Sequence, residues 1–307
     1  MPESQKFSAV KQSPNRRVFF PFFRNCSQAI LSITRTALLC FGFILCFGFI
    51  FPVAESDAQE STPSVTLPAR EKFRIVVLAG QSNMAGRGTV TPEDRIENPR
   101  VLMLTRDGNW VPATDPIHYD KPNAGVGLGH TFANRLAASD PTITVGLVPT
   151  ACGGSSLDDW MPGAYFSQTK SHPYDDAIAR TKQALQNGTL EVILWHQGES
   201  DCSEGKAEKH EAKLLELFKR FRKEFDAPSV PIIVGELSPQ IAASSPKYFK
   251  IISDAQRSAV NQLQPAAFVS AEGTTLNPDK VHFDRESLIE LGNRYYDAFE
   301  SLKKTPQ

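Results

Sequence analysis

Apolar runs and amphipathic stretches alternate along this chain from about residue 72 to its end. The apolar runs are short and rich in β-branched residues, which predicts buried strands at residues 73–79, 100–105, 143–149, 191–196, 231–237 and 266–271. The stretches that separate and follow them have helical periodicity, which predicts helices at residues 129–138, 175–186, 206–225, 247–263 and 286–302. Such alternation is typical of a single α/β domain whose mostly parallel sheet is covered on both faces.

The N-terminal segment has a different composition. Residues 1–35 are basic, residues 36–54 carry no charge, and small residues follow at Ser56 and Ala58. This order is typical of an export signal, here residues 1–58. Because the basic region is long, an uncleaved membrane anchor through residues 36–54 is the alternative. A polar linker at residues 59–71 precedes the domain at residues 72–302, which we expect to be secreted or otherwise extracytoplasmic.

Charge and motif spacing limit the partners and cofactors. The chain has 33 basic and 34 acidic residues, and without residues 1–58 it keeps 27 and 31. A mildly acidic domain lacks the basic surface that nucleic acid requires. No glycine-rich loop has dinucleotide or P-loop spacing, and no histidine has metal-ligand spacing. We therefore expect no nucleic acid, no cofactor and no metal.

A serine bounded by glycine follows the first predicted strand, in the order Gly80-Gln81-Ser82-Asn83. In open α/β sheets, ligands bind at the carboxyl ends of the strands. A hydroxyl that projects from a turn at this edge suits a nucleophile. A tight turn capped by polar side chains is the structural alternative.

Two further polar clusters follow predicted strands. Gly153-Gly154 comes after residues 143–149, where backbone N–H groups without a neighbouring Cβ can bind an oxyanion. Gln197 and Glu199 come after residues 191–196 and supply an amide and a carboxylate. A dense polar segment directly after a buried strand is costly unless it is solvated or functional.

The last cluster is an Asp-x-x-His unit, Asp279 to His282, shortly before the final helix. An aspartate at this spacing can reach one ring nitrogen and so orient the histidine as a general base. Trp160 and Tyr165 lie in the loop that follows Gly153-Gly154. They form either a stacking wall for a sugar or ordinary hydrophobic packing.

Together these clusters resemble the sialate O-acetylesterase domain of the SGNH-hydrolase superfamily, which the family 6 carbohydrate esterases share. The motifs that carry the resemblance are Gly-Gln-Ser-Asn-Met from Gly80, Gly153-Gly154, the segment from Trp195 to Asp201, and Asp-Lys-Val-His from Asp279. The resemblance covers residues 72–302. It implies a three-layer α/β/α sandwich around a five-stranded parallel sheet, and hydrolysis of O-acetyl esters on an acetylated oligo- or polysaccharide of acetylxylan or sialate type.

The resemblance also implies a role for each motif residue. Ser82 corresponds to the nucleophile, and its N–H group to one oxyanion donor. Gly153 or Gly154 corresponds to the second donor, and the Gln197 amide stands where the family has the third. His282 corresponds to the general base.

The carboxylate that supports His282 is Asp279 or, as in some members of this branch, Glu199. The family fold makes the loops that carry Cys152 and Cys202 neighbours, which predicts a disulfide between them. Two other functions stay open: an esterase or lipase acting on a non-carbohydrate ester, and a non-catalytic carbohydrate-binding surface protein.

Overall fold

The computed structural model describes residues 65–304. The predicted export segment lies outside these residues, as does the first part of the linker. Within the described residues, no helix combines the length and the apolarity needed to cross a bilayer.

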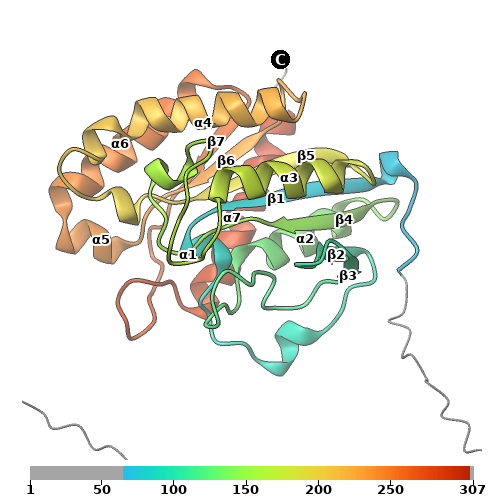
Figure 1. The fold of residues 1–307 in the computed structure, drawn as a ribbon. Helices are drawn as coiled ribbons and strands as arrows, with labels where there is room; N and C mark the ends of the chain where they lie inside the picture. The colour runs from blue at the N-terminus through green and yellow to red at the C-terminus, as the bar shows by residue number, and fades with distance from the viewer. Residues whose placement is uncertain (1–64, 305–307) are drawn as a thin grey trace, which may run out of the picture. The chain divides into compact units, whose positions relative to one another are not determined.

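Seven strands form one sheet in the order β3-β2-β4-β1-β5-β6-β7 (Figure 1). Six of them run parallel, and β3 pairs antiparallel with β2 at one edge. The strands are β1 (Phe73–Gly80), β2 (Val101–Leu104), β3 (Trp110–Pro112), β4 (Thr144–Pro149), β5 (Thr189–His196), β6 (Ile232–Gly235) and β7 (Ala266–Val269).

The mostly parallel α/β sheet is confirmed, and all six strands predicted from the pattern are present. The count of five strands implied by the family resemblance is wrong. The pattern missed β3 because its three residues are half-buried and too short for a periodic signal.

Seven α-helices connect and flank the strands of the described residues. They are α1 (Ser82–Ala85), α2 (Leu128–Ser139), α3 (Pro173–Leu185), α4 (His210–Glu224), α5 (Pro239–Ser244), α6 (Pro246–Gln262) and α7 (Arg285–Lys304). The five longer helices match the predicted ones. The helix predicted from residue 206 begins later, because Ala207–Lys209 forms a 3₁₀ turn before α4.

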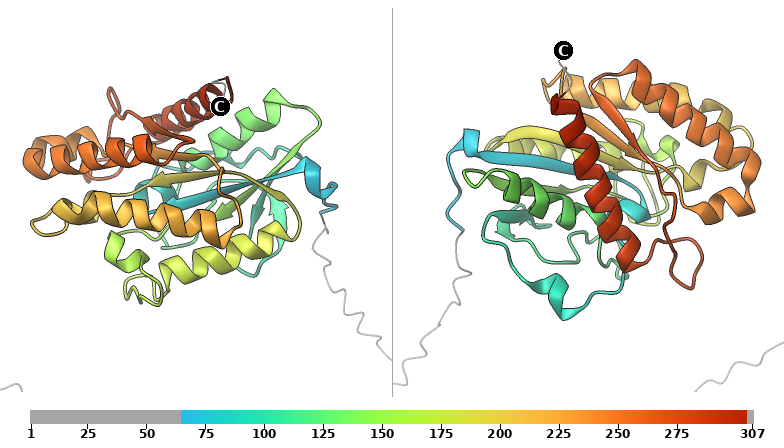
Figure 2. Two further views of the ribbon diagram at one scale, coloured as in Figure 1. Left: turned by 90° about the horizontal axis from the view of Figure 1, so that it is seen from above. Right: turned by 180° about the vertical axis from the view of Figure 1, so that it is seen from behind.

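The helices form two layers that enclose the sheet (Figure 2). Helices α2 and α7 pack on one face, and α3, α4 and α6 pack on the other. Each layer packs on its own hydrophobic core, the first under α2 and α7 and the second under α3, α4 and α6. Successive residues of β1 alternate between them: Val76 and Leu78 lie in the first core, whereas Val77 lies in the second. Because both faces are covered, β1 is apolar at every position from Ile75 to Ala79 rather than at every second one.

The aromatic residues of the loop after Gly153-Gly154 have different environments. Trp160 is fully buried, and its ring centroid lies 5.1 Å from that of Trp195 in the second core. Tyr165 is 57% exposed and contacts the His172 ring. Trp160 therefore packs in the interior and cannot form a wall for a sugar.

The topology places a switch point at the carboxyl end of β1. Strand β1 lies between β4 and β5, and the chain crosses from one of these neighbours to the other through α3. Such a switch point is where open α/β sheets bind their ligands. Gly80 ends β1 at a φ of 130°, and a Cβ atom there would lie 2.2 Å from the His196 carbonyl oxygen, so only glycine fits.

Acid is expected to destabilise the fold through His196, which is fully buried beside Tyr295. Burial lowers the pKa of His196 to about 3. An unfolded chain protonates the same ring near pH 6.5, so between these values the unfolded state binds more protons and stability falls as pH falls. The slope is about 1.4 kcal/mol per pH unit for one such group.

The glutamine of His196→Gln cannot titrate in this range. Between about pH 6 and pH 4, the free energy of unfolding of this variant should therefore fall less steeply than that of the wild type, by about 1.4 kcal/mol per pH unit. Urea unfolding at both pH values measures the difference. His172→Gln, at an exposed position, is the matched control and should follow the wild-type curve. Parallel curves for wild type and His196→Gln would disprove the linkage.

Candidate active site

Three of the predicted residues meet at the carboxyl edge of the sheet. Ser82 is the first residue of α1, directly beyond β1, and is 6% exposed. His282 Nε2 lies 3.0 Å from Ser82 Oγ, and His282 Nδ1 lies 2.7 Å from Asp279 Oδ2. Such an arrangement lets a histidine take the serine proton while an acid holds its other nitrogen.

The turn that carries the histidine is built by Asp279 itself. Its Oδ1 atom accepts the N–H groups of Val281 and His282 at 2.9 and 3.0 Å. Lys280, which follows Asp279 in the turn, has a φ of 59°, the left-handed conformation of a tight turn. Burial by itself would raise the pKa of Asp279, but the hydrogen bonds from His282 and Val281 outweigh it and hold the pKa below its usual value. Asp279 therefore stays ionised beside the histidine.

Asn83 had no role assigned from the sequence. It connects this turn to α1, the helix that begins at Ser82, through hydrogen bonds. The Asn83 side chain is fully buried. Its Oδ1 atom accepts the N–H of Phe283 at 3.1 Å, and its Nδ2 atom donates to the Val281 carbonyl at 3.4 Å. Asn83 thus binds the backbone on both sides of His282. The only sequence signal was its place beside Ser82.

Glu199 lies behind Asn83 and makes no hydrogen bond to His282. Its Oε1 atom accepts from Asn83 Nδ2 at 2.6 Å, and its Oε2 atom has no partner among the described residues. Burial raises the pKa of Glu199, although the bond from Asn83 opposes the shift. Of the two carboxylates considered for His282, the structure places Asp279 on the ring nitrogen.

The Gly153 amide meets a buried ion pair that the sequence did not reveal. Gly153 N–H donates to Asp120 Oδ2 at 2.9 Å, and Arg87 Nη2 binds the same oxygen at 2.7 Å. The side chains of Arg87 and Asp120 are 4% and 3% exposed. A Cβ atom on Gly153 would lie 2.5 Å from Arg87 Nη2 and 3.5 Å from Ser82 Cβ, so the pair and the serine both crowd this glycine.

Hydrogen bonds hold the loops after β1, β4 and β5 together. Gln81 Oε1 accepts the N–H groups of Gly198 and Ser200 at 3.4 Å each. Ser200 Oγ donates to the Gly154 carbonyl at 2.8 Å. The loops that contribute to the site therefore form one hydrogen-bonded unit.

Gln197 has a different position from the one predicted. Its side chain is fully buried, and its Nε2 atom donates to the Ser155 carbonyl at 3.2 Å and to Asp201 Oδ2 at 2.5 Å. A carboxamide has only two N–H groups, and both are used here. The prediction that Gln197 is an oxyanion donor is therefore wrong for this structure, in which the residue braces the loops from beneath.

The predicted disulfide is also wrong, because Cys152 and Cys202 are both free. The Cys152 sulfur lies 3.7 Å from the Thr150 carbonyl and from Ser171 Oγ. Cys202 packs against a separate small apolar cluster that contains Leu237. The two thiols occupy different environments, although their loops are neighbours.

Loss of the Arg87–Asp120 pair is expected to displace the loop that carries Gly153 and so to lower any activity of Ser82. In Asp120→Asn the side chain keeps an acceptor for Gly153 N–H but leaves the Arg87 charge buried without a counter-ion. We expect kcat to fall by about tenfold or more, through a displaced loop, and stability to fall by about 3 kcal/mol. Steady-state kinetics and urea unfolding measure the two effects separately.

Asp94→Asn is the matched control, since Arg285 binds Asp94 through two hydrogen bonds of 2.7 and 2.8 Å outside the loop that carries Gly153. It should lower stability while kcat of the folded protein stays within about twofold of the wild-type value. An unchanged kcat in Asp120→Asn would show that the pair does not position the loop that carries Gly153.

A buried serine hydrogen-bonded to a His–Asp pair, at the switch point of a three-layer α/β/α fold, is the arrangement of a serine hydrolase. Within the described residues, no cluster of three or more His, Cys, Asp or Glu side chains is arranged to hold a metal ion. The profile of the family described as "Carbohydrate esterase, sialic acid-specific acetylesterase" matches residues 72–301, and the chain belongs to that family. The protein is thus a carboxylic ester hydrolase, and its family acts on O-acetyl esters of carbohydrates.

Known relatives share the fold. A protein of Arabidopsis thaliana described as a probable carbohydrate esterase is 31% identical over 264 residues, which cover 79% of this chain and 95% of the relative. The crystal structure of that same protein superposes with a TM-score of 0.66 over 74% of this chain and 98% of the relative.

Two more distant structures agree in fold. NanS superposes with a TM-score of 0.62 at 19% identity, over 78% of this chain and 99% of its own. A carbohydrate acetylesterase from Xanthomonas citri superposes with a TM-score of 0.59 at 18% identity, over 75% of this chain and 56% of its own.

Proposed function

We propose that this protein is an exported serine esterase that removes acetyl groups from a carbohydrate through an acetyl-enzyme on Ser82. The observation that carries the proposal is the continuous contact from Ser82 Oγ to His282 Nε2 and from His282 Nδ1 to Asp279. Family membership supports the acetyl ester of a carbohydrate as the substrate class.

In the first half of the reaction, Ser82 Oγ attacks the acetyl carbonyl carbon while His282 Nε2 takes the hydroxyl proton. The C–O bond to the sugar then breaks, and His282 returns the proton to the leaving sugar oxygen. In the second half, His282 deprotonates a water molecule, which attacks the acetyl-serine ester. Acetate leaves, and Ser82 recovers its proton. Asp279 stabilises the protonated histidine in both halves.

The negative charge on the carbonyl oxygen needs N–H donors close to Ser82. The first N–H groups of a helix have no intrahelical acceptor, so the Ser82 N–H at the start of α1 is available. The Gly153 N–H is taken by Asp120. We therefore assign the second donor to Gly154, whose N–H forms no hydrogen bond among the described residues.

Export remains a proposal from residues 1–58, which precede the described domain. Fractionation of cells that make the full chain, with the mass of the mature N-terminus, tests both location and cleavage. A full-length protein in the cytosol would contradict the proposal.

The test of the activity itself is acetate release from acetylated xylan, O-acetylated sialic acid and acetylated pectin, together with labelling by a fluorophosphonate probe mapped to Ser82. Release from at least one carbohydrate and labelling of Ser82 are expected. Activity confined to non-carbohydrate esters would favour the esterase or lipase alternative. Neither release nor labelling would favour a non-catalytic carbohydrate-binding protein.

A further inference from the structure

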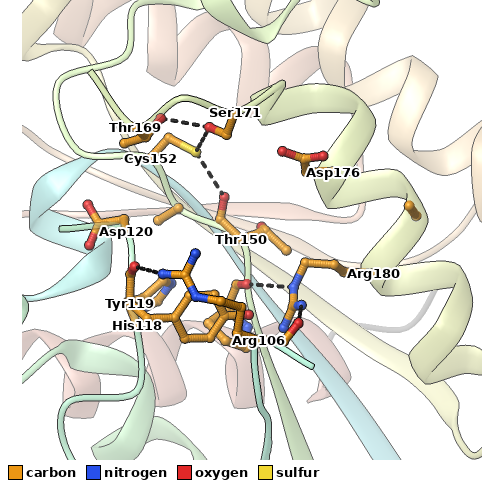
Figure 3. A pocket seen from close by; sticks show the side chains of 13 residues that line it. Arg106, His118, Tyr119, Asp120, Thr150, Cys152, Thr169, Ser171, Asp176 and Arg180 are labelled. Carbon is orange, nitrogen blue, oxygen red and sulfur yellow. Dashed lines mark hydrogen bonds between the residues drawn. The ribbon is translucent and has the colours of Figure 1, made fainter. Parts of the chain in front are cut away.

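A pocket of about 310 Å³ lies beside the loop that carries Gly153-Gly154 (Figure 3). Its walls come from the end of β4 and the residues after it, from α3, and from the segment around Asp120. Six of the residues that line it are Arg106, Asp120, Thr150, Cys152, Thr169 and Ala179. The proposed mechanism uses none of this space.

The pocket adjoins the loop that packs beside the nucleophile. Cys152, in its wall, directly precedes Gly153, and a Cβ atom on Gly153 would lie 3.5 Å from Ser82 Cβ. Asp120 also lines the pocket, and its carboxylate binds Gly153 N–H. Asp120 thus connects the wall of the pocket to the glycine that packs beside Ser82.

The pocket is not a second catalytic centre. Burial raises the pKa of the Cys152 thiol to about 11, so the sulfur is not a thiolate nucleophile near neutral pH. Burial lowers the pKa of His118 to about 4, so this ring is neutral. Both side chains form parts of the wall.

The pocket is also poorly built for an anion. The Arg180 guanidinium donates to the backbone carbonyls of Leu104, Thr105, Arg106 and Pro149 at 3.0 to 3.3 Å, which uses most of its N–H groups. The other two charged side chains of the outer wall, Arg106 and Asp176, are exposed and opposite in sign. An uncharged ligand matches this balance.

The acetyl group of the substrate does not account for the pocket either. An acetyl group is far smaller than 310 Å³, which is the volume range of pockets that hold whole small molecules. An acetyl group on Ser82 would therefore leave most of this pocket empty.

We propose that this pocket binds an uncharged sugar residue of the substrate that neighbours the acetylated one. The inference rests on the proposed function and makes an oligosaccharide, rather than a single sugar, the preferred substrate. Apolar walls at Pro149, Ala151 and Ala179 suit the C–H face of a sugar ring. Arg106 and the hydroxyl of Thr169 supply polar groups for its hydroxyls.

Ala179→Trp tests the proposal, because Ala179 is an exposed residue of α3 and a large side chain there fills the pocket without entering the core. The substrates are an acetylated oligosaccharide released from the polymer that the wild type deacetylates, the matching acetylated monosaccharide, and 4-nitrophenyl acetate. Ala243→Trp, on the exposed side of α5 and outside the pocket, is the matched control.

We expect Ala179→Trp to raise KM for the oligosaccharide about tenfold, a loss of about 1.4 kcal/mol in binding. Its kinetics on the monosaccharide and on 4-nitrophenyl acetate should stay within about twofold of the wild type, which corresponds to less than about 0.5 kcal/mol. Ala243→Trp should change none of the three substrates. Hydrolysis of 4-nitrophenyl acetate reports only the chemistry at Ser82. A wild type that does not hydrolyse this ester would therefore contradict the proposed function rather than the pocket assignment.

Three results would overturn the pocket assignment. In the first, Ala179→Trp leaves oligosaccharide KM unchanged. In the second, the wild type cleaves only monosaccharide acetates. In the third, the wild type hydrolyses 4-nitrophenyl butyrate and Ala179→Trp removes that activity alone, which would assign the pocket to the acyl chain.

Discussion

Ser82→Ala is expected to abolish acetate release, with kcat lower by about 10⁴- to 10⁶-fold than in the wild type. Alanine lacks the hydroxyl oxygen that attacks the acetyl carbon, so no acetyl-enzyme can form. The fold should persist, since Ser82 Oγ bonds only to His282 among the described residues. Acetate release and fluorophosphonate labelling measure the loss, and the melting temperature reports on folding.

Ser167→Ala, at an exposed position outside the site, is the matched control and should keep both activity and labelling. Appreciable acetate release by folded Ser82→Ala protein would eliminate the serine mechanism. Labelling of a different residue in the wild type would relocate the nucleophile.

Asp279→Asn is expected to lower kcat by about 10²- to 10⁴-fold, because an amide neither fixes the required tautomer of His282 nor stabilises its protonated form. Glu199→Gln should lose less than about tenfold, since its Oε1 atom can still accept from Asn83 and it makes no bond to His282. Steady-state kinetics on one acetyl ester compare the two variants directly.

The pH profile adds a second readout for Asp279. Hydrogen bonds hold its pKa below the usual value, so its carboxylate contribution is present at neutral pH and is lost only as pH falls through that lowered pKa. The deficit of Asp279→Asn should therefore be constant from about pH 6 to pH 9. A large loss in Glu199→Gln with near-normal Asp279→Asn would reverse the assignment of the supporting acid.

Much of the fold could be predicted from local patterns alone. The apolar run that became β1 is buried on both faces of the sheet, and the periodic stretches became the five long helices. Their signal is strong because burial of one or both faces fixes which positions of an element are apolar, and a long element repeats that pattern several times. The edge strand β3 and the short helices α1 and α5 gave no such signal, since their few residues cannot establish a period.

The residues of the serine and histidine motifs could also be named in advance. Ser82 lies at the carboxyl end of a strand, and Asp279 reaches His282 within one turn, so both features depend on neighbours along the chain. Asn83 and the Arg87–Asp120 pair escaped prediction. Their partners are distant in sequence, and an isolated asparagine or an arginine near a motif carries no signal of its own.

The sequence by itself therefore determined the alternation of elements, the family, and the presence of a serine, a histidine and acids at strand ends. Only the tertiary structure decided which polar hydrogens are free and which are used. Gln197 turned inward to Ser155 and Asp201, and the two cysteines stayed apart. A side chain's hydrogen bonds depend on atoms brought together by packing, and spacing along the chain does not encode that packing.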